Sequence, residues 1–209
     1  MRTPKALLVL LVLFLFASGA ATQSRAAMLG DAKVAFRAER VVTVDGRRYV
    51  GTLIHAPGHQ RHEQDLLGMH EVFLLDIAAA RGFLVLPGLK TYVEFPFPAL
   101  MAELDAPDLV RSPLGDETIS GMHTTKYRID HRAKDGSRAE GFAWVSRAGV
   151  LMKLDIQVAR ARGGRPLAIA MELSHVVIGP QDAHSFDVPA GFSRLPADAL
   201  GPLMGGKPG

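Results

Sequence analysis

Four histidines and two carboxylates fall within one sixteen-residue stretch of the sequence: His55, His59, His62, Glu63, Asp65 and His70. Two imidazoles and a carboxylate could hold zinc or copper if they converged from rigid elements. The His59-x-x-His62 spacing matches no recognised ligand pattern, and histidines in loops are usually solvated. The sequence therefore favours solvated histidines, and it predicts no metal ion and no other cofactor.

Glu63 and Asp65 could also act as a catalytic pair. They lie two positions apart on a predicted strand, so their side chains share a face. Paired carboxylates can raise one pKa for acid–base chemistry. However, the sequence contains no G-x-S-x-G, H-E-x-x-H, phosphate-loop or dinucleotide motif, and no cysteine. An exposed charged face is the favoured interpretation, and no enzymatic activity is predicted.

A larger group of apolar side chains could line a ligand cavity. Burying an acyl chain there would gain about 0.8 kcal/mol per CH₂, and methionine and phenylalanine repack well around a flexible guest. The alternative, which stays open, is that these residues fill the core, as side chains do in small barrels. The eleven candidates are Phe36, Phe73, Leu75, Phe83, Tyr92, Phe95, Phe97, Met101, Trp144, Met152 and Met171.

A short helix is predicted between two groups of strands. It would begin near Pro98, run for roughly ten residues, and end at Pro107 or Pro113. Because Pro96 and Pro98 separate this segment from the strands, its apolar residues are candidates for a movable gate over the cavity. These are Phe97, Leu100, Met101 and Leu104.

The N-terminal residues have the layout of a secretory signal peptide. Arg2 and Lys5 precede a twelve-residue apolar run at 6–17, and small side chains follow at 18–21. Such a run spans only about 18 Å as a helix, short of a ~30 Å hydrocarbon core. We expect cleavage after Ala20 or Ala21, with Ala27 as a later possibility, and a product in the periplasm or outside the cell. With no cysteine, it would carry no lipid anchor.

The charge balance argues against nucleic acid as a partner. The chain has 24 Lys and Arg residues against 21 Asp and Glu, and the first 21 residues hold two of the basic residues and none of the acidic ones. Phosphate binding needs cations clustered on one face. Arginines at predicted turns could meet lipid headgroups, although solubility explains them as well. They are Arg47, Arg48, Arg160, Arg162 and Arg165.

Alternation of apolar and polar residues dominates the rest of the chain and predicts about ten antiparallel strands. The ranges are 34–44, 49–56, 61–67, 70–78, 83–86, 90–95, 122–132, 138–146, 150–161 and 166–178. Asp45-Gly46 and Asp135-Gly136 are strong hairpin signals. We expect one mainly β (α+β) domain over 28–195, a monomer, with a disordered tail at 196–209. A sheet this large must curl to cover its apolar face.

Four stretches, in this order, resemble motifs of exported bacterial proteins related to the outer-membrane lipoprotein carrier (LolA/LolB-like) superfamily. They are PGLKTYVE at 87–94, GDETISG followed by TTKY within 115–127, WVS with a downstream glycine and lysine within 144–153, and FDVPAGF at 186–192. The resemblance covers about residues 32–192 and is nearest to a periplasmic domain family within that superfamily.

This resemblance implies a strongly curved antiparallel half-barrel, with one or a few short helices on its concave side and an apolar cavity between. Relatives use such a cavity to carry or sense acyl chains of lipoproteins or glycolipids. We therefore expect non-enzymatic binding of a hydrophobic ligand, the acyl chain of a lipid or lipoprotein. A second function stays open: an envelope sensor that presents its sheet to a protein partner and holds no ligand.

Overall fold

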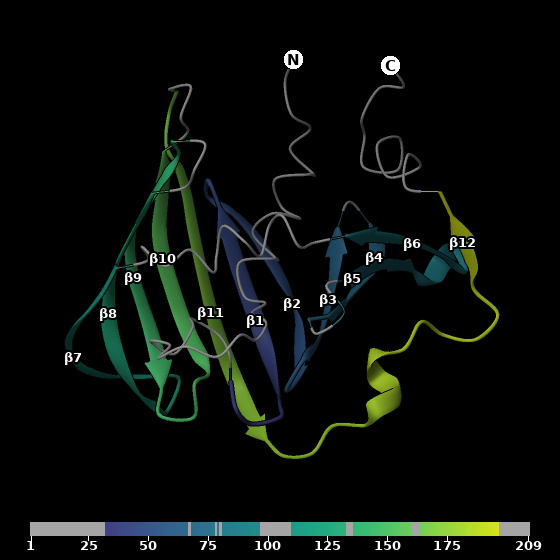
Figure 1. The fold of residues 1–209 in the computed structure, drawn as a ribbon, viewed down its shortest axis with the longest axis horizontal. Coiled ribbons are helices and arrows are strands. Elements are labelled where there is room, and N and C mark those ends of the chain that lie inside the picture. The colour runs from purple at the N-terminus through teal and green to yellow at the C-terminus, as the bar shows by residue number, and fades with distance from the viewer. Residues whose placement is uncertain are drawn as a thin grey trace.

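The computed structural model describes residues 32–66, 68–77, 79, 81–96, 110–132, 136–159 and 164–196 of the chain. These residues form one twelve-stranded sheet with the spatial order β12-β6-β5-β4-β3-β2-β1-β11-β10-β9-β8-β7 (Figure 1). The strands are β1 (Phe36–Val44), β2 (Arg47–Ala56), β3 (His59–Leu66), β4 (Met69–Asp76), β5 (Arg81–Leu86), β6 (Thr91–Pro96), β7 (Val110–Ile119), β8 (Met122–Arg132), β9 (Arg138–Ser146), β10 (Leu151–Ala159), β11 (Leu167–Ile178) and β12 (Ser193–Leu195).

Two runs of consecutive antiparallel strands, β1 to β6 and β7 to β11, make up most of the sheet. They are joined where β1 pairs with β11. The Asp45-Gly46 signal is confirmed as the turn between β1 and β2, because Val44 pairs with Arg47. Both turn residues have positive φ, at 47° and 79°, which is the backbone that a two-residue hairpin turn requires.

The prediction of a mainly β fold with a curled, mostly antiparallel sheet is confirmed, but the strand count and the helices differ. The structure adds β7 and β12 to the ten predicted strands. β7 contains Pro113 and Gly115, which read as loop residues, yet β7 lies at the sheet edge, where proline is tolerated. β12 has only three residues, and it pairs with β6 in parallel.

The described helices are two short 3-10 helices, η1 (Pro87–Leu89) and η2 (Ala183–Phe186). Neither corresponds to the helix predicted from Pro98, which lies outside the described residues, as do the predicted signal peptide and most of the predicted tail. No helix in the described ranges is long and apolar enough to span a membrane.

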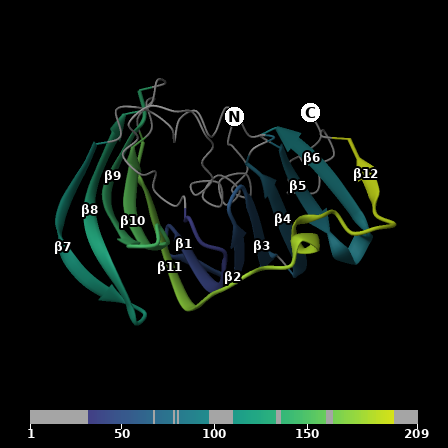
Figure 2. The same ribbon diagram turned by 60° about the horizontal axis from the view of Figure 1, so that its bottom comes forward.

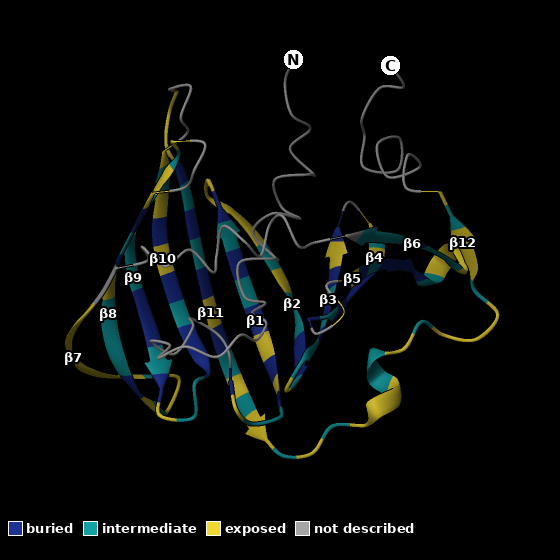
Figure 3. Cartoon of the chain, viewed as in Figure 1, coloured by how far each residue is buried: buried dark blue, intermediate teal, exposed yellow. Residues whose placement is uncertain are grey.

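The sheet curls into an open trough whose edge strands, β7 and β12, stand apart (Figure 2). Burial alternates along the strands, as the banding of β10 and β11 shows in Figure 3. One buried cluster joins residues of β1, β2 and β8 to β11. Side chains from so many strands can converge only on the concave side of a curled sheet. We call this side the inner face and the opposite side the outer face.

A C-terminal segment covers part of the outer face. After β11 the chain runs past β2 and β3 to bring β12 beside β6 (Figures 1 and 2). Val188 and Phe192 of this segment pack against a buried cluster formed by Val72, Leu74 and Val85. Arg61 also donates a hydrogen bond from Nη1 to the carbonyl oxygen of Ser185 (3.0 Å). These contacts hold the C-terminal segment against the outer face of β3 to β6.

Candidate functional site

The structure divides the eleven predicted cavity residues between the two faces of the sheet. Cross-strand partners share a face, and the pairing from β1 to β6 links Phe36, Leu75 and Phe95 in one row and places Phe73 in the next. The inner-face members are Phe36, Phe73, Leu75, Phe95, Met152 and Met171.

Three predicted residues lie on the outer face. Phe83 and Tyr92 contact each other beneath the C-terminal segment, with ring centroids 6.1 Å apart. Trp144 pairs with Lys126 on the outer face, whereas its neighbour Ala143 joins the inner core. Phe97 and Met101 lie outside the described residues, as do the other two gate candidates. The eleven residues therefore do not line one cavity together.

Apart from Arg40, the described inner face of β1, β11 and β10 is apolar across all three strands. Val42 pairs with Met171, and Met171 pairs with Leu154; all three are at most 4% exposed. The outer face of the same strands is charged, with Glu172 paired to Lys153. This contrast is expected of an antiparallel sheet that has one face buried and the other face in contact with water.

A buried polar row interrupts this inner face between β1 and β4. Arg40 pairs with Gly51, Gly51 with Gln64, and Gln64 with Glu71, so these four residues form one row across four strands. His62 lies beside the row, on the same face, in register with Phe73. Arg40 is 1% exposed and His62 is fully buried. Because Gly51 has no side chain, nothing at that position stands between Arg40 and β3.

Hydrogen bonds connect the members of this polar row. Arg40 donates from Nη1 to His62 Nδ1 (2.5 Å) and from Nη2 to Gln64 Oε1 (3.3 Å). His62 donates from Nε2 to Gln60 Oε1 (2.9 Å), and Gln64 donates from Nε2 to Glu71 Oε2 (3.5 Å). This assignment requires a neutral His62 that accepts at Nδ1.

Burial sets the charge states in the row. Desolvation lowers the pKa of Arg40 to about 9, so the guanidinium stays charged at neutral pH. Burial, reinforced by the charge of Arg40, holds the pKa of His62 well below its usual value, which keeps the ring neutral. Burial also raises the pKa of Glu71, although the hydrogen bond from Gln64 opposes this. The row thus holds one cation whose direct partners are neutral side chains.

The histidine window does not converge on one point. His55 contacts the carbonyl oxygen of Val34 and stacks on Phe36, whereas His62 joins the polar row. His59 lies against the ring of Phe186, and His70 pairs with Asp65. Residues three apart on a strand point to opposite faces, which explains why His59 and His62 separate. No cluster of potential metal ligands occurs in the described residues.

Of the two predicted carboxylates, Asp65 is exposed, as expected for a charged face, whereas Glu63 is half-buried. Glu63 pairs with Arg61 and Asp65 with His70, on the face of β3 opposite His62. Of the predicted turn arginines, Arg165 lies 3.5 Å from a carboxylate oxygen of Asp45. Arg47 and Arg48 are exposed, and Arg160 and Arg162 lie outside the described ranges.

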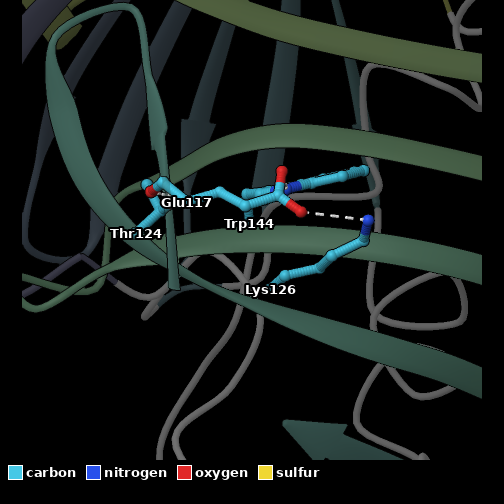
Figure 4. Close-up of polar contacts among 4 residues, drawn as sticks. All are labelled: Glu117, Thr124, Lys126 and Trp144. Carbon is cyan, nitrogen blue, oxygen red and sulfur yellow. Dashed lines mark hydrogen bonds and ion pairs between the residues drawn. The ribbon is translucent and has the colours of Figure 1, made fainter. Parts of the chain in front are cut away.

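A second polar cluster, on the outer face, brings together residues from two of the recognised motifs (Figure 4). The Trp144 indole donates to Glu117 Oε2 (2.7 Å), and Lys126 Nζ donates to Glu117 Oε1 (3.1 Å). Lys126 Nζ lies 4.9 Å from the Trp144 ring centroid, and Lys153 Nζ lies 5.2 Å from it. These contacts tie edge strand β7 to β8, β9 and β10, so the motif residues have a structural role here.

Acid should weaken this outer cluster at a pH below the ordinary titration range of a glutamate. The hydrogen bond from Trp144, followed by that from Lys126, lowers the pKa of Glu117 from its ordinary 4.5. A lowered pKa contributes stability that is complete above the ordinary value and is lost as the pH falls through the folded-state value. We expect Glu117→Gln to be less stable than the wild type at pH 7, with the difference vanishing in acid. Urea unfolding from pH 7 to pH 3, followed by Trp144 fluorescence, measures this; a pH-independent difference would contradict it.

Sequence reasoning missed most of the polar row. Arg40 occupies an apolar register position between Ala38 and Val42, and Gln60 and Gln64 flank His62 with the same alternation. A polar residue in such a position is a signal that could have been used. Its partners could not be identified from the sequence, because the row is assembled across four strands by their register.

No protein-family model and no curated protein matches the chain. Similar solved structures include an uncharacterized conserved protein from Thermus thermophilus, 9% identical, with a TM-score of 0.52, covering 78% of this chain and 91% of that chain. A MucA/MucB complex from Pseudomonas aeruginosa is 14% identical with a TM-score of 0.49, covering 77% of this chain and 57% of that chain. A LolA superfamily protein from Nitrosomonas europaea is 8% identical with a TM-score of 0.39, covering 74% and 90%.

The similarity to the Thermus protein extends over most of both chains and concerns the fold alone. That shared fold is the open, curled, mostly antiparallel β-sheet described above. The class that the fold defines is therefore that of open, curled, mainly β sheets.

Proposed function

We propose that this protein binds the acyl chain of a lipid or lipoprotein against the inner face of its sheet, without covalent chemistry. It would do so as a monomer in the periplasm or outside the cell, after removal of the predicted signal peptide. The observation that carries the proposal is the contrast between the apolar inner face and the charged outer face of β1, β11 and β10.

The energetics of this face suit an alkyl guest. Neighbouring strands lie about 4.8 Å apart, so the apolar surface from β1 through β11 and β10 to β9 extends over about 14 Å. Each CH₂ group transferred there from water contributes about 0.8 kcal/mol. Met152 and Met171 belong to this surface, and methionine adapts its shape to irregular neighbours. A guest of this kind needs no catalytic group.

Native purification followed by lipid analysis tests the proposal. We expect mass spectrometry of a solvent extract of the purified protein to find an acyl lipid in amounts approaching one per chain. The stripped protein should take up the neutral dye N-phenyl-1-naphthylamine and release it to hexadecan-1-ol. A lipid-free protein that binds neither probe would overturn the proposal and favour the envelope-interaction alternative.

A matched pair of variants on β1 locates the site. Ala38 is 2% exposed on the inner face, and Val41 lies on the outer face of the same strand. Ala38→Phe should weaken dye and alcohol binding several-fold, because the ring takes up space on the inner face. Val41→Phe should leave binding unchanged. A filled core would instead make Ala38→Phe destabilising by about 1–3 kcal/mol, which circular dichroism during thermal unfolding would reveal.

A further inference from the structure

Arg40 is a buried cation that forms no ion pair with any residue in the described part of the chain. It is 1% exposed, and its two hydrogen-bond acceptors, His62 Nδ1 and Gln64 Oε1, are neutral. Within the described ranges, no acceptor lies opposite Arg40 Nε, and no ion pair joins Arg40 to an acid. Burying a charge without a partner of opposite sign is costly.

We infer that Arg40 binds the acidic headgroup of the amphiphile whose tail lies on the inner face. This inference rests on the proposed function and adds the chemical class of the ligand: an acyl compound that ends in an acidic group, carboxylate or phosphate. The Nε–H supplies the free donor. The guanidinium supplies the charge, which makes such a hydrogen bond stronger than one between neutral groups.

The position of Arg40 in the sheet supports this assignment. Arg40 lies on β1, and the strand on one side of it, β11, leads into the apolar surface of Met171 and Leu154. On the other side lie the neutral amides and imidazole of Gln60, Gln64 and His62. A headgroup at Arg40 would thus sit at a border, with polar groups on one side and room for the tail on the other.

Electrostatics favour an anion in this row. His62 is held neutral by burial and by Arg40, so it adds no competing positive charge. Glu71, the nearest acid in the row, bonds to Gln64 rather than to Arg40. Because burial raises the pKa of Glu71, its ionisation is disfavoured, and its repulsion of an incoming anion is reduced.

Three ligands with the same sixteen-carbon tail distinguish the contribution of the headgroup to binding from that of the alkyl tail. They are hexadecanoate, hexadecyl phosphate and hexadecan-1-ol. Each is titrated at pH 7 against the purified, lipid-stripped protein loaded with N-phenyl-1-naphthylamine. We expect at least one acid to displace the dye at a concentration about ten-fold or more below that of the alcohol, as a charge-assisted hydrogen bond predicts. The tighter of the two acids identifies the headgroup.

Arg40→Met is the decisive variant. It should remove the preference for acids while leaving dye and alcohol binding intact, because methionine keeps a linear apolar side chain and buried charges are commonly replaceable by apolar residues. Arg40→Lys should retain part of the preference, which guards against a folding defect in the first variant. Arg37→Met, on the exposed face of the same strand, is the matched control and should behave like the wild type.

The outcomes distinguish this inference from the proposed function. Equal displacement by acids and alcohol in the wild type, or an acid preference that survives in Arg40→Met, overturns the role of Arg40 while chain binding stands. Failure of the dye and of all three ligands to bind overturns chain binding itself. A preference for acids that is lost in Arg40→Met, kept in part in Arg40→Lys and unchanged in Arg37→Met supports both.

Discussion

Replacing Gly51 by alanine should destabilise the protein by about 3 kcal/mol. A Cβ at this position would overlap the backbone carbonyl oxygen of Glu63 and come within 3.3 Å of Gln64 Cβ. The obstruction is mainly backbone of the paired strand, so β2 and β3 would have to separate, and strain of this kind typically costs about 1–3 kcal/mol or more. Urea unfolding measures the change, with Trp144, the sole tryptophan, as the fluorescent reporter.

The matched control is Gly179→Ala. No atom lies within 4 Å of a Cβ built at Gly179, and its φ is not positive. We expect that variant to stay within about 0.5 kcal/mol of the wild type. Equal unfolding free energies for Gly51→Ala and Gly179→Ala would show that β2 and β3 are not as close as described. Gly51→Ala should also disturb Arg40, which lies in register with Gly51.

Truncating Phe73 to alanine should produce the largest loss among single side chains of the inner face. Phe73 is 1% exposed, and it lies in register with His62 on β3 and Leu84 on β5. Removing a fully packed phenylalanine costs about 3–5 kcal/mol, since the neighbours relax only partly into the space. Leu114→Ala on the exposed edge strand, where Leu114 is 51% exposed, should cost less than about 0.5 kcal/mol.

The size of the Phe73 effect separates a core residue from a ligand contact. A loss of about 3–5 kcal/mol in the lipid-stripped protein, with unchanged affinity for hexadecan-1-ol, would assign Phe73 to the packed core. A smaller loss combined with weaker alcohol binding would place Phe73 against the guest. Thermal unfolding of the stripped protein and dye displacement provide the two measurements.

Much of the sheet was predictable because alternation and turn chemistry are local. The hairpin at Asp45-Gly46 needs only its own residues to form, and its register follows from a two-residue turn. Strand β7 was not predicted because Pro113 and Gly115 usually interrupt strands. Proline is tolerated in an edge strand, but whether a strand lies at the edge depends on the arrangement of the whole sheet. The β12–β6 pairing likewise depends on where a distant segment of the chain returns.

The faces of individual residues were harder to predict. Trp144 is 6% exposed on the outer face, where the ammonium groups of Lys126 and Lys153 lie 4.9 and 5.2 Å from its ring centroid. Basic side chains can pack on an aromatic ring at a protein surface, so a large aromatic residue does not by itself identify the inner face. Charged residues generally prefer solvent, so the residue type of Arg40 favours an exposed position, whereas the structure buries it.

The seam between β1 and β11 has a consequence for how the chain folds. Each run of strands is a meander of local contacts that can form early, but the seam pairs residues far apart in the chain, such as Val44 with Ile169. Contacts between distant residues form slowly because a long loop must first close. Seam closure is therefore the expected rate-limiting step, and until it occurs β1 and β11 are two unpaired, aggregation-prone edges. The chain is therefore most vulnerable to aggregation during that interval.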